Sequence, residues 1–163
     1  MTALTGEELI AWVEKTTEDW KGLIQAHPEI WAMPCDVASA GTVAALLQHV
    51  VAVELRYAQR LEGVPESPYA EVLFDTPERL FAFHDCAMVM VGSLVADKET
   101  DWDRQIEFQT ISAGRLRASR KAVLIHMLMH SIRHYAQLQT LVRQHGIKPD
   151  FPGDYLFMDA TRA

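Results

Sequence analysis

The feature that most constrains the fold is a helical spacing of apolar residues that recurs in four stretches of the chain. These stretches span about residues 6–26, 41–62, 77–95 and 119–145. Within each one, apolar residues return at steps of three and four, which places them on one face of an α-helix. Four such faces can be buried by packing against one another. The sequence therefore predicts an all-α protein, a four-helix bundle of the up-and-down kind.

Capping residues and helix breakers mark where these helices begin and end. Thr5 can cap the first helix, and Glu8 stands three residues later, as a capping box requires. Pro28 ends this helix, because the residue before a proline is biased out of the helical conformation. Gly63 is placed to terminate the second helix, and Thr76 precedes a proline that suits the first turn of the third.

Residues 98–118 interrupt the helical pattern before the fourth helix. The run IEFQTISAGRLR alternates apolar and polar residues around a glycine, which favours a small hairpin or a long extended crossover. Beyond the fourth helix we expect a short tail that packs on the bundle through Tyr155, Leu156 and Phe157. Because no internal repeat or linker divides the chain, residues 1–163 are predicted to form a single domain.

Composition and charge narrow the location and the partners. The net charge of −7 opposes binding to nucleic acids and to anionic membranes, and no run of about 18 apolar residues suggests a membrane span. The N-terminus lacks the basic start and apolar stretch of a signal peptide. Cys35 and Cys86 are too few for a disulfide framework or a thiolate zinc site. We therefore expect a cytoplasmic protein that binds neither nucleic acid nor membrane.

Histidines are concentrated in the fourth helix. His126, His130 and His134 follow one another at steps of four, which advance about 40° each, so the three imidazoles share one helix face. His49 interrupts the apolar surface of the second helix and can complete a three-histidine set if the two helices pack together. Three imidazoles and a water leave an open position, as in catalytic zinc sites. Spacing alone leaves exposed or core histidines as the alternative.

Two stretches of the sequence resemble the DinB/YfiT-like superfamily of four-helix proteins. Its second helix is similar to LLQHVVAVELRYAQRLEG, where a histidine follows two apolar positions. Its last helix is similar to VLIHMLMHSIRHYAQLQTLVRQHGIKP, where HxxxH is followed by a small residue and glutamine. The layout is alike from about residue 5 to residue 150. The chain departs from the commoner pattern at Ala136, where many members have glycine, and this change concerns helix packing more than metal binding.

The resemblance implies a divalent metal ion, with zinc, nickel and iron as candidates, held by His49, His130 and His134. It implies that His126 is a neighbour of the ion rather than a ligand. Gln137 is a candidate to support an imidazole or a bound water by a hydrogen bond, and ordinary helix packing is the alternative. Imidazole suits several metals, so the ligands do not identify the ion.

The superfamily also suggests a reaction class. Members with known activity include transferases and isomerases that use low-molecular-weight thiols such as bacillithiol or mycothiol, and many relatives have no assigned reaction. The resemblance thus implies a metal-dependent enzyme of small molecules, a thiol transferase or a hydrolase, whose metal would acidify a thiol at neutral pH. The alternative is a non-catalytic metal-binding protein with a role in stress response or interaction.

Charged residues near these helices add candidates of a second kind. Arg115, Arg117 and Arg120 precede or open the fourth helix, where the helix dipole would help them attract the carboxylates of a thiol cofactor. A solvated face is the alternative for these arginines. Glu54 stands five residues after His49, and we expect it at the surface rather than beside the metal as a base.

Other metal and nucleophile sites lack their patterns. A di-iron carboxylate bundle needs Glu-x-x-His pairs and a zincin needs HExxH, and the sequence contains neither. His84, Asp85 and Cys86 are consecutive, so on a helix they point in different directions and do not form a catalytic histidine–cysteine pair.

Large apolar side chains suggest self-association. Proteins that resemble this chain commonly form homodimers, and closed two-fold pairing is the commonest way to cover apolar surface. We expect a two-fold homodimer made through helix faces that carry Trp12, Trp20, Trp31 and Phe81. The alternative is that these aromatic residues lie in the monomer core or under the C-terminal tail.

Overall fold

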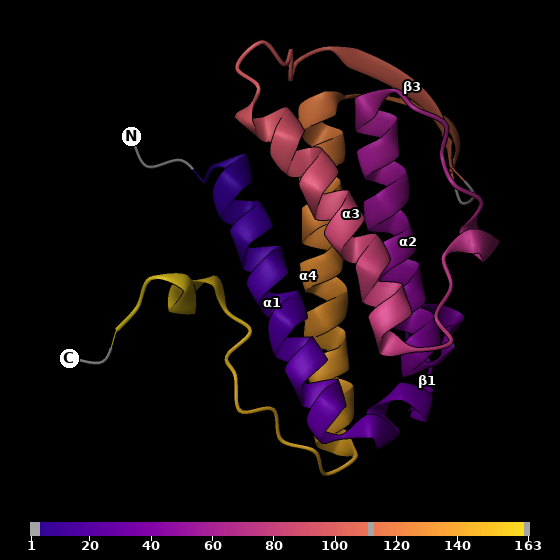
Figure 1. Ribbon diagram of the computed structural model, residues 1–163, viewed down its shortest axis with the longest axis vertical. Coiled ribbons are helices and arrows are strands. Elements are labelled where there is room, and N and C mark those ends of the chain that lie inside the picture. Colours follow the sequence, from indigo (N-terminus) through magenta and orange to yellow (C-terminus); the bar gives the residue numbers. More distant parts are fainter. Residues whose placement is uncertain (1–3, 111–112, 162–163) are drawn as a thin grey trace.

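Four long helices make up most of this computed structural model, which describes residues 4–110 and 113–161. They are α1 (Gly6–Ala26), α2 (Val43–Glu62), α3 (Pro77–Ala96) and α4 (Arg120–Gln144). Their bounds lie within two residues of the predicted stretches, and they pack as the predicted all-α four-helix bundle (Figure 1). Short elements connect them: η1 (Pro28–Ala32), β1 (Pro34–Cys35), η2 (Val37–Ser39), β2 (Gly41–Thr42), η3 (Tyr69–Glu71), β3 (Gln105–Thr110), β4 (Gly114–Ser119) and η4 (Tyr155–Met158).

Side-chain caps fix where the helices start. Thr5 and Glu8 form the predicted capping box: Thr5 Oγ1 accepts from the Glu8 amide at 3.1 Å, and the Thr5 amide donates to Glu8 Oε2 at 2.7 Å. Thr42, Thr76 and Ser119 each accept a hydrogen bond from the amide three residues later. Each such cap stabilises its helix by about 1 kcal/mol.

The helix directions depart from a simple up-and-down arrangement, because α2 and α3 run parallel (Figure 1). Arg120, which opens α4, donates to the Leu61 carbonyl at the end of α2 at 2.7 Å, so these two helices are antiparallel. The connection of residues 63–76 returns along the length of the bundle. Its 14 residues can extend over about 45 Å, more than the roughly 30 Å length of α2.

Two small antiparallel sheets lie at the ends of the bundle. β3 and β4 pair from Gln105 opposite Ser119 to Thr110 opposite Gly114, which is the predicted hairpin before the last helix. Residues 111 and 112 of that predicted segment lie outside the described residues. The second sheet joins β1 and β2, and β2 (Gly41–Thr42) takes the first two residues of the stretch predicted as the second helix. Strands of two residues are too short for an alternating pattern to reveal them.

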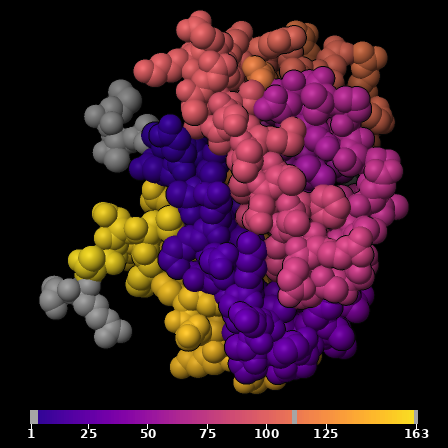
Figure 2. All heavy atoms as spheres, viewed as in Figure 1, coloured from indigo at the N-terminus to yellow at the C-terminus, as the bar shows by residue number. Residues whose placement is uncertain are grey.

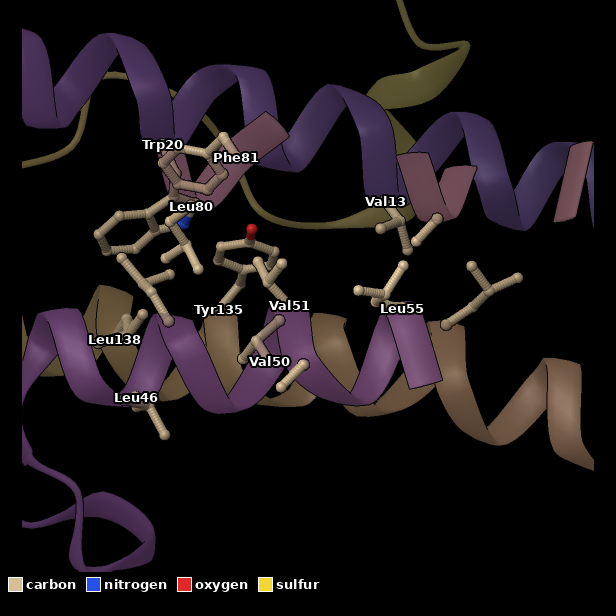
Figure 3. Packing of buried hydrophobic residues seen from close by; sticks show 14 of the residues in the cluster. Val13, Trp20, Leu46, Val50, Val51, Leu55, Leu80, Phe81, Tyr135 and Leu138 are labelled. Carbon is tan, nitrogen blue, oxygen red and sulfur yellow. The ribbon is translucent and has the colours of Figure 1, made fainter. Parts of the chain in front are cut away.

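The core fills the space between the four helices, and its largest buried side chains come from all of them (Figure 3). Trp20 is only 1% exposed and stacks on Tyr135, with ring centroids 5.9 Å apart. Phe81 is 3% exposed. The expectation that these aromatic residues form an outer face is therefore wrong for Trp20 and Phe81, whereas Trp12 and Trp31 are half-buried.

The C-terminal tail packs on α1 through fewer of its apolar residues than expected. Tyr155 meets Trp12 edge to face at 5.3 Å, and Phe151 meets Trp20 at 6.0 Å. Leu156 and Phe157 are 69% and 49% exposed, so the expectation that they hold the tail is wrong. The tail is anchored where its aromatic rings contact tryptophans of α1.

Of the described helices, α3 alone is long and apolar enough to cross a membrane, with a mean hydropathy of 1.4 over 18 residues. In the structure it packs against α2 and α1 as a member of the bundle, and Figure 2 shows it beside α1 on the front face. Bundle helices pass the same test of length and composition, so this property alone is weak evidence for a membrane span.

Candidate metal centre

Three imidazoles meet where α2 packs against α4. His49 comes from the middle of α2, while His130 and His134 lie one turn apart on α4. His130 Nε2 is 3.1 Å from His49 Nε2 and 3.2 Å from His134 Nε2. One nitrogen from each of the three residues lies within 4.8 Å of the others. His130 and His134 are buried and His49 is half-buried.

The separations between these nitrogens suit a single metal ion. With metal–nitrogen bonds of about 2.1 Å, two ligands lie about 3.0 Å apart at a right angle and about 3.4 Å apart at the tetrahedral angle. The observed 3.1 and 3.2 Å fall between these values. The separations of His130 from His49 and from His134 therefore suit shared binding of one divalent ion, and a three-histidine set would leave further coordination positions for other ligands.

The outer ring nitrogens fix the orientation of two of the three imidazoles. His134 Nδ1 donates to Gln137 Oε1 at 2.7 Å, which leaves the lone pair of His134 Nε2 directed at the other histidines. His49 Nδ1 lies 3.2 Å from Tyr69 Oη. His130 Nδ1 is buried and has no hydrogen-bond partner among the described residues. Gln137 is thus placed to support the ring of His134.

The surroundings keep the three imidazoles neutral. Burial, helped by the neighbouring imidazoles and by Arg133, lowers the pKa of His130 to about 3. Burial also lowers the pKa of His134 to about 4, although the hydrogen bond to Gln137 opposes this. The pKa of His49 is lowered by burial and by Arg133. Because only a neutral imidazole can coordinate a metal, the site is in its ligating form at neutral pH.

His126 lies one turn before His130 but does not join the converging nitrogens. Its ring centroid is 5.8 Å from that of His130 and 5.5 Å from that of Tyr57, and the residue is exposed. Burial lowers its pKa, and the charges of Arg133 and Arg60 lower it further. His126 therefore faces the space beside the cluster rather than the point where the three nitrogens meet.

That space is a cavity of about 520 Å³ that borders His49 and His130. Its other lining residues come from α2, η3, the β3–β4 hairpin and α4: Val53, Arg56, Tyr57, Arg60, Tyr69, Gln109, Thr110, His126 and Arg133. A larger hollow of about 760 Å³ lies between α1 and α3, but no histidine lines it. Of these two cavities, the smaller one borders the converging imidazoles.

Nearly the whole chain matches one protein family. A model of the DinB family covers residues 1–161. The chain belongs to the DinB family. None of the curated proteins matches it. The family match spans all four helices, so the likeness of two sequence stretches to DinB/YfiT-like proteins extends to the complete bundle.

The structure does not bring the three expected anion-binding arginines of this DinB chain to the cavity. Arg115 pairs with Glu107 across the β3–β4 hairpin, and Arg117 is exposed on β4. Arg120 donates to the Leu61 carbonyl and lies 5.9 Å from the Trp102 ring centroid. None of these arginines lines the cavity.

Three other arginines, which the sequence analysis missed, do line it: Arg56, Arg60 and Arg133. Arg56 and Arg60 follow His49 by seven and eleven residues, and Arg133 follows His130 by three. These intervals place each arginine on the face of its helix that carries one of the converging imidazoles. The spacing was therefore the signal that could have identified them.

A buried ion pair between Glu54 and His84 lies next to the three-histidine group. Glu54 is fully buried, and its carboxylate lies 2.7 Å from His84 Nδ1 and accepts from Ser131 Oγ at 2.7 Å. The expectation of Glu54 at the surface is wrong, because Glu54 follows Val50 by four residues and shares its buried face. Burial alone would lower the pKa of His84, but the Glu54 charge and hydrogen bond raise it. The contacts tie α2, α3 and α4 together next to His130.

Proposed function

We propose that this chain is a metal-dependent enzyme that acts on a small molecule, with a zinc, nickel or iron ion on His49, His130 and His134. The observation that carries the proposal is the convergence of three neutral imidazoles at the wall of a cavity of about 520 Å³. A structural site would close all coordination positions with protein ligands. Among the described residues three imidazoles converge, and the cavity that His49 and His130 line has the size of a small-molecule site.

The residues around the centre supply orientation and a partly dry environment. Gln137 holds the ring of His134, and Tyr69 contacts the ring of His49. Burial raises the pKa of Tyr69 to about 12, although Arg56 opposes this, so its hydroxyl keeps its proton at neutral pH. When bound, a divalent ion would supply a Lewis acid that lowers the pKa of a coordinated thiol or water.

The reaction that we favour is transfer that depends on a low-molecular-weight thiol. The support is the resemblance to superfamily members with this activity, together with a cavity that borders two of the three imidazoles that would hold the ion. The alternative, a non-catalytic metal-binding protein, uses the same three imidazoles but has no role for the cavity. Binding of a thiol at the metal therefore separates the two.

The first experiment tests the metal. Zn²⁺ is titrated into metal-free protein by calorimetry, and we expect about one ion per chain, as one three-histidine group allows. His130→Ala and His134→Ala should abolish binding, because each removes one of three ligands. His126→Ala should weaken it much less, and His27→Ala serves as the control, because the 42% exposed side chain of His27 lies outside the three-histidine group. Loss of the metal in His126→Ala but not in His134→Ala would refute the assignment.

The second experiment tests the thiol. Co²⁺-loaded protein is mixed with low-molecular-weight thiols, and a thiolate that binds the ion should produce a near-ultraviolet charge-transfer band and a further rise in Tm. The Cys86→Ser variant is used throughout, because Cys86 is the exposed thiol of the described chain. The band should be absent in His134→Ala. Metal uptake without any thiol-dependent band or Tm shift would reject the transferase and favour the non-catalytic alternative.

A further inference from the structure

The cavity beside the histidines carries the opposite charge to the protein as a whole. The chain has a net charge of −7. Among the described residues that line the cavity there are three arginines and no aspartate or glutamate. A cavity of one sign with low-dielectric walls concentrates ligands of the other sign. The charge distribution therefore points to an anionic ligand.

The arginines are built into the same helix faces as the imidazoles. Arg56 and Arg60 lie about two and three turns after His49 on α2. Arg133 lies on α4 almost one turn after His130. Packing of α2 against α4 thus brings the guanidinium groups to the cavity by the same contact that brings the imidazoles together.

Arg60 has mainly a structural task. Its Nε and Nη2 donate to Glu66 at 2.8 and 3.0 Å, and its guanidinium lies between Tyr57 and Phe108, 4.3 and 4.2 Å from their ring centroids. The side chain is only 6% exposed. Arg60 therefore fixes the β3 strand against α2 and contributes charge to the cavity, rather than a group free to meet a ligand.

Arg56 and Arg133 are better placed than Arg60 to contact a ligand in the cavity. Arg56 donates Nη1 to the Ser67 carbonyl at 2.7 Å, and its Nη2 is 2.8 Å from Glu66. Glu66 is thus shared between Arg56 and Arg60, and a single carboxylate does not neutralise two guanidinium groups. Arg133 is exposed, and no carboxylate of the described chain lies within ion-pair distance of it. Positive charge at the cavity therefore remains uncompensated by protein.

We propose that Arg133, together with Arg56, forms a subsite that binds the carboxylate of a small-molecule substrate or cofactor whose other end reaches the metal position. Binding of the ligand's other end at the metal rests on the proposed function, whereas binding of its carboxylate is argued from the arginines alone. The planar guanidinium of Arg133 can bind a carboxylate with two parallel hydrogen bonds. The apolar and aromatic surface of Val53, Tyr57 and Tyr69 in the cavity would contact the part of the ligand between its carboxylate and its metal-binding end.

Two thiols that differ in one end group provide the test. 6-Mercaptohexanoate and 6-mercaptohexanol share chain length and thiol, so a difference in affinity reports the carboxylate. Both are titrated by calorimetry into Zn²⁺-loaded protein at pH 8, where His49, His130 and His134, whose pKa values are lowered, are neutral. The acid should bind about tenfold more tightly than the alcohol, as expected for charge-assisted hydrogen bonds. The preference should fall to about twofold or less in Arg133→Gln and should persist in part in Arg133→Lys.

A matched control removes the same charge elsewhere on the helix. Arg143→Gln changes an exposed arginine in the last turn of α4, which does not line the cavity, and should keep the full preference for the acid. Zinc content and circular dichroism are measured for each variant, so that loss of metal or of fold is seen directly. Arg56→Gln is secondary, because Arg56 also holds the Ser67 carbonyl.

The outcomes separate the subsite from the thiol chemistry. Equal affinity of the native protein for acid and alcohol would overturn the subsite and leave the metal site and its thiol intact. If neither thiol binds, the thiol part of the proposed function fails, and hexanoate decides the subsite. Hexanoate is then titrated into metal-free protein and followed by NMR. Shifts around Arg133 that vanish in Arg133→Gln would uphold the subsite, and no shifts there would overturn it.

Discussion

Burial lowers the pKa of His130 to about 3 and that of His134 to about 4, whereas a histidine in an unfolded chain titrates near pH 6.5. As the pH falls below 6.5, the unfolded chain therefore takes up protons that the folded chain does not. The free energy of unfolding then decreases with falling pH. The contribution of His84 to stability has the opposite pH dependence. Burial lowers the pKa of His84, but Glu54 outweighs burial and raises it, so this stabilisation is lost only as the pH rises.

We accordingly expect the metal-free protein to lose stability between pH 6.5 and pH 5, by at most about 2 kcal/mol for each imidazole kept neutral. Urea unfolding at several pH values measures this loss. His130→Ala and His134→Ala should each show a shallower dependence than the native chain, because one such group is gone. Zn²⁺ should protect the native protein against acid until protons compete for its ligands. Equal slopes in the native chain and both variants would contradict the prediction.

At single positions, the sequence predicts which residues share a helix face, because this depends only on their spacing. His49, His130 and His134 converge in the structure because their places on two apolar helices face each other. The spacing of Arg133, three residues after His130, indicates that it shares the histidine face of α4, whereas the segments that close the cavity around it, η3 and the β3–β4 hairpin, are placed only by long-range packing. Arg115 was chosen from local charge, and its pairing with Glu107 depends on the hairpin register. Long-range contacts of this kind are absent from any one stretch of sequence.

At the scale of the helices, the buried contact of Glu54 with His84 and Ser131 joins three of them. We expect Glu54→Leu and His84→Leu each to destabilise the protein by about 3–5 kcal/mol, because each leaves a polar group buried without its partner. The double variant should cost clearly less than the sum, since it removes both groups together. Urea unfolding of the four proteins gives the coupling energy.

A control for this cycle is Glu18→Leu, which changes a carboxylate with a 75% exposed side chain and should alter stability by no more than about 0.5 kcal/mol. Strictly additive effects of the two core changes would show that Glu54 and His84 act independently. Coupling would show that the contact between Glu54 and His84 holds α2 and α3 together next to the candidate metal centre.

Helix ends were predictable because caps are local. Thr5, Thr42, Thr76 and Ser119 each act within three residues, and the observed helix starts follow them. The parallel course of α2 and α3 was not predictable in this way. Residues 63–76 are long enough either to loop back or to cross the bundle, and packing of the whole molecule chooses between these courses.

For the whole molecule, the expected two-fold homodimer needs an interface other than Trp20 and Phe81, which are buried in the core. The outer face of α3 offers one, since Val89 is 70% exposed between exposed Cys86 and Ser93 on an unusually apolar helix. We expect sedimentation equilibrium at micromolar concentration to show a species of twice 18.4 kDa, because two-fold pairing covers such a face on both chains at once. Val89→Asp should shift the equilibrium to monomer, whereas Leu156→Asp, on the exposed tail, should not. A species that stays at 18.4 kDa as the concentration rises would sink the dimer, and the face of α3 would then be solvated surface.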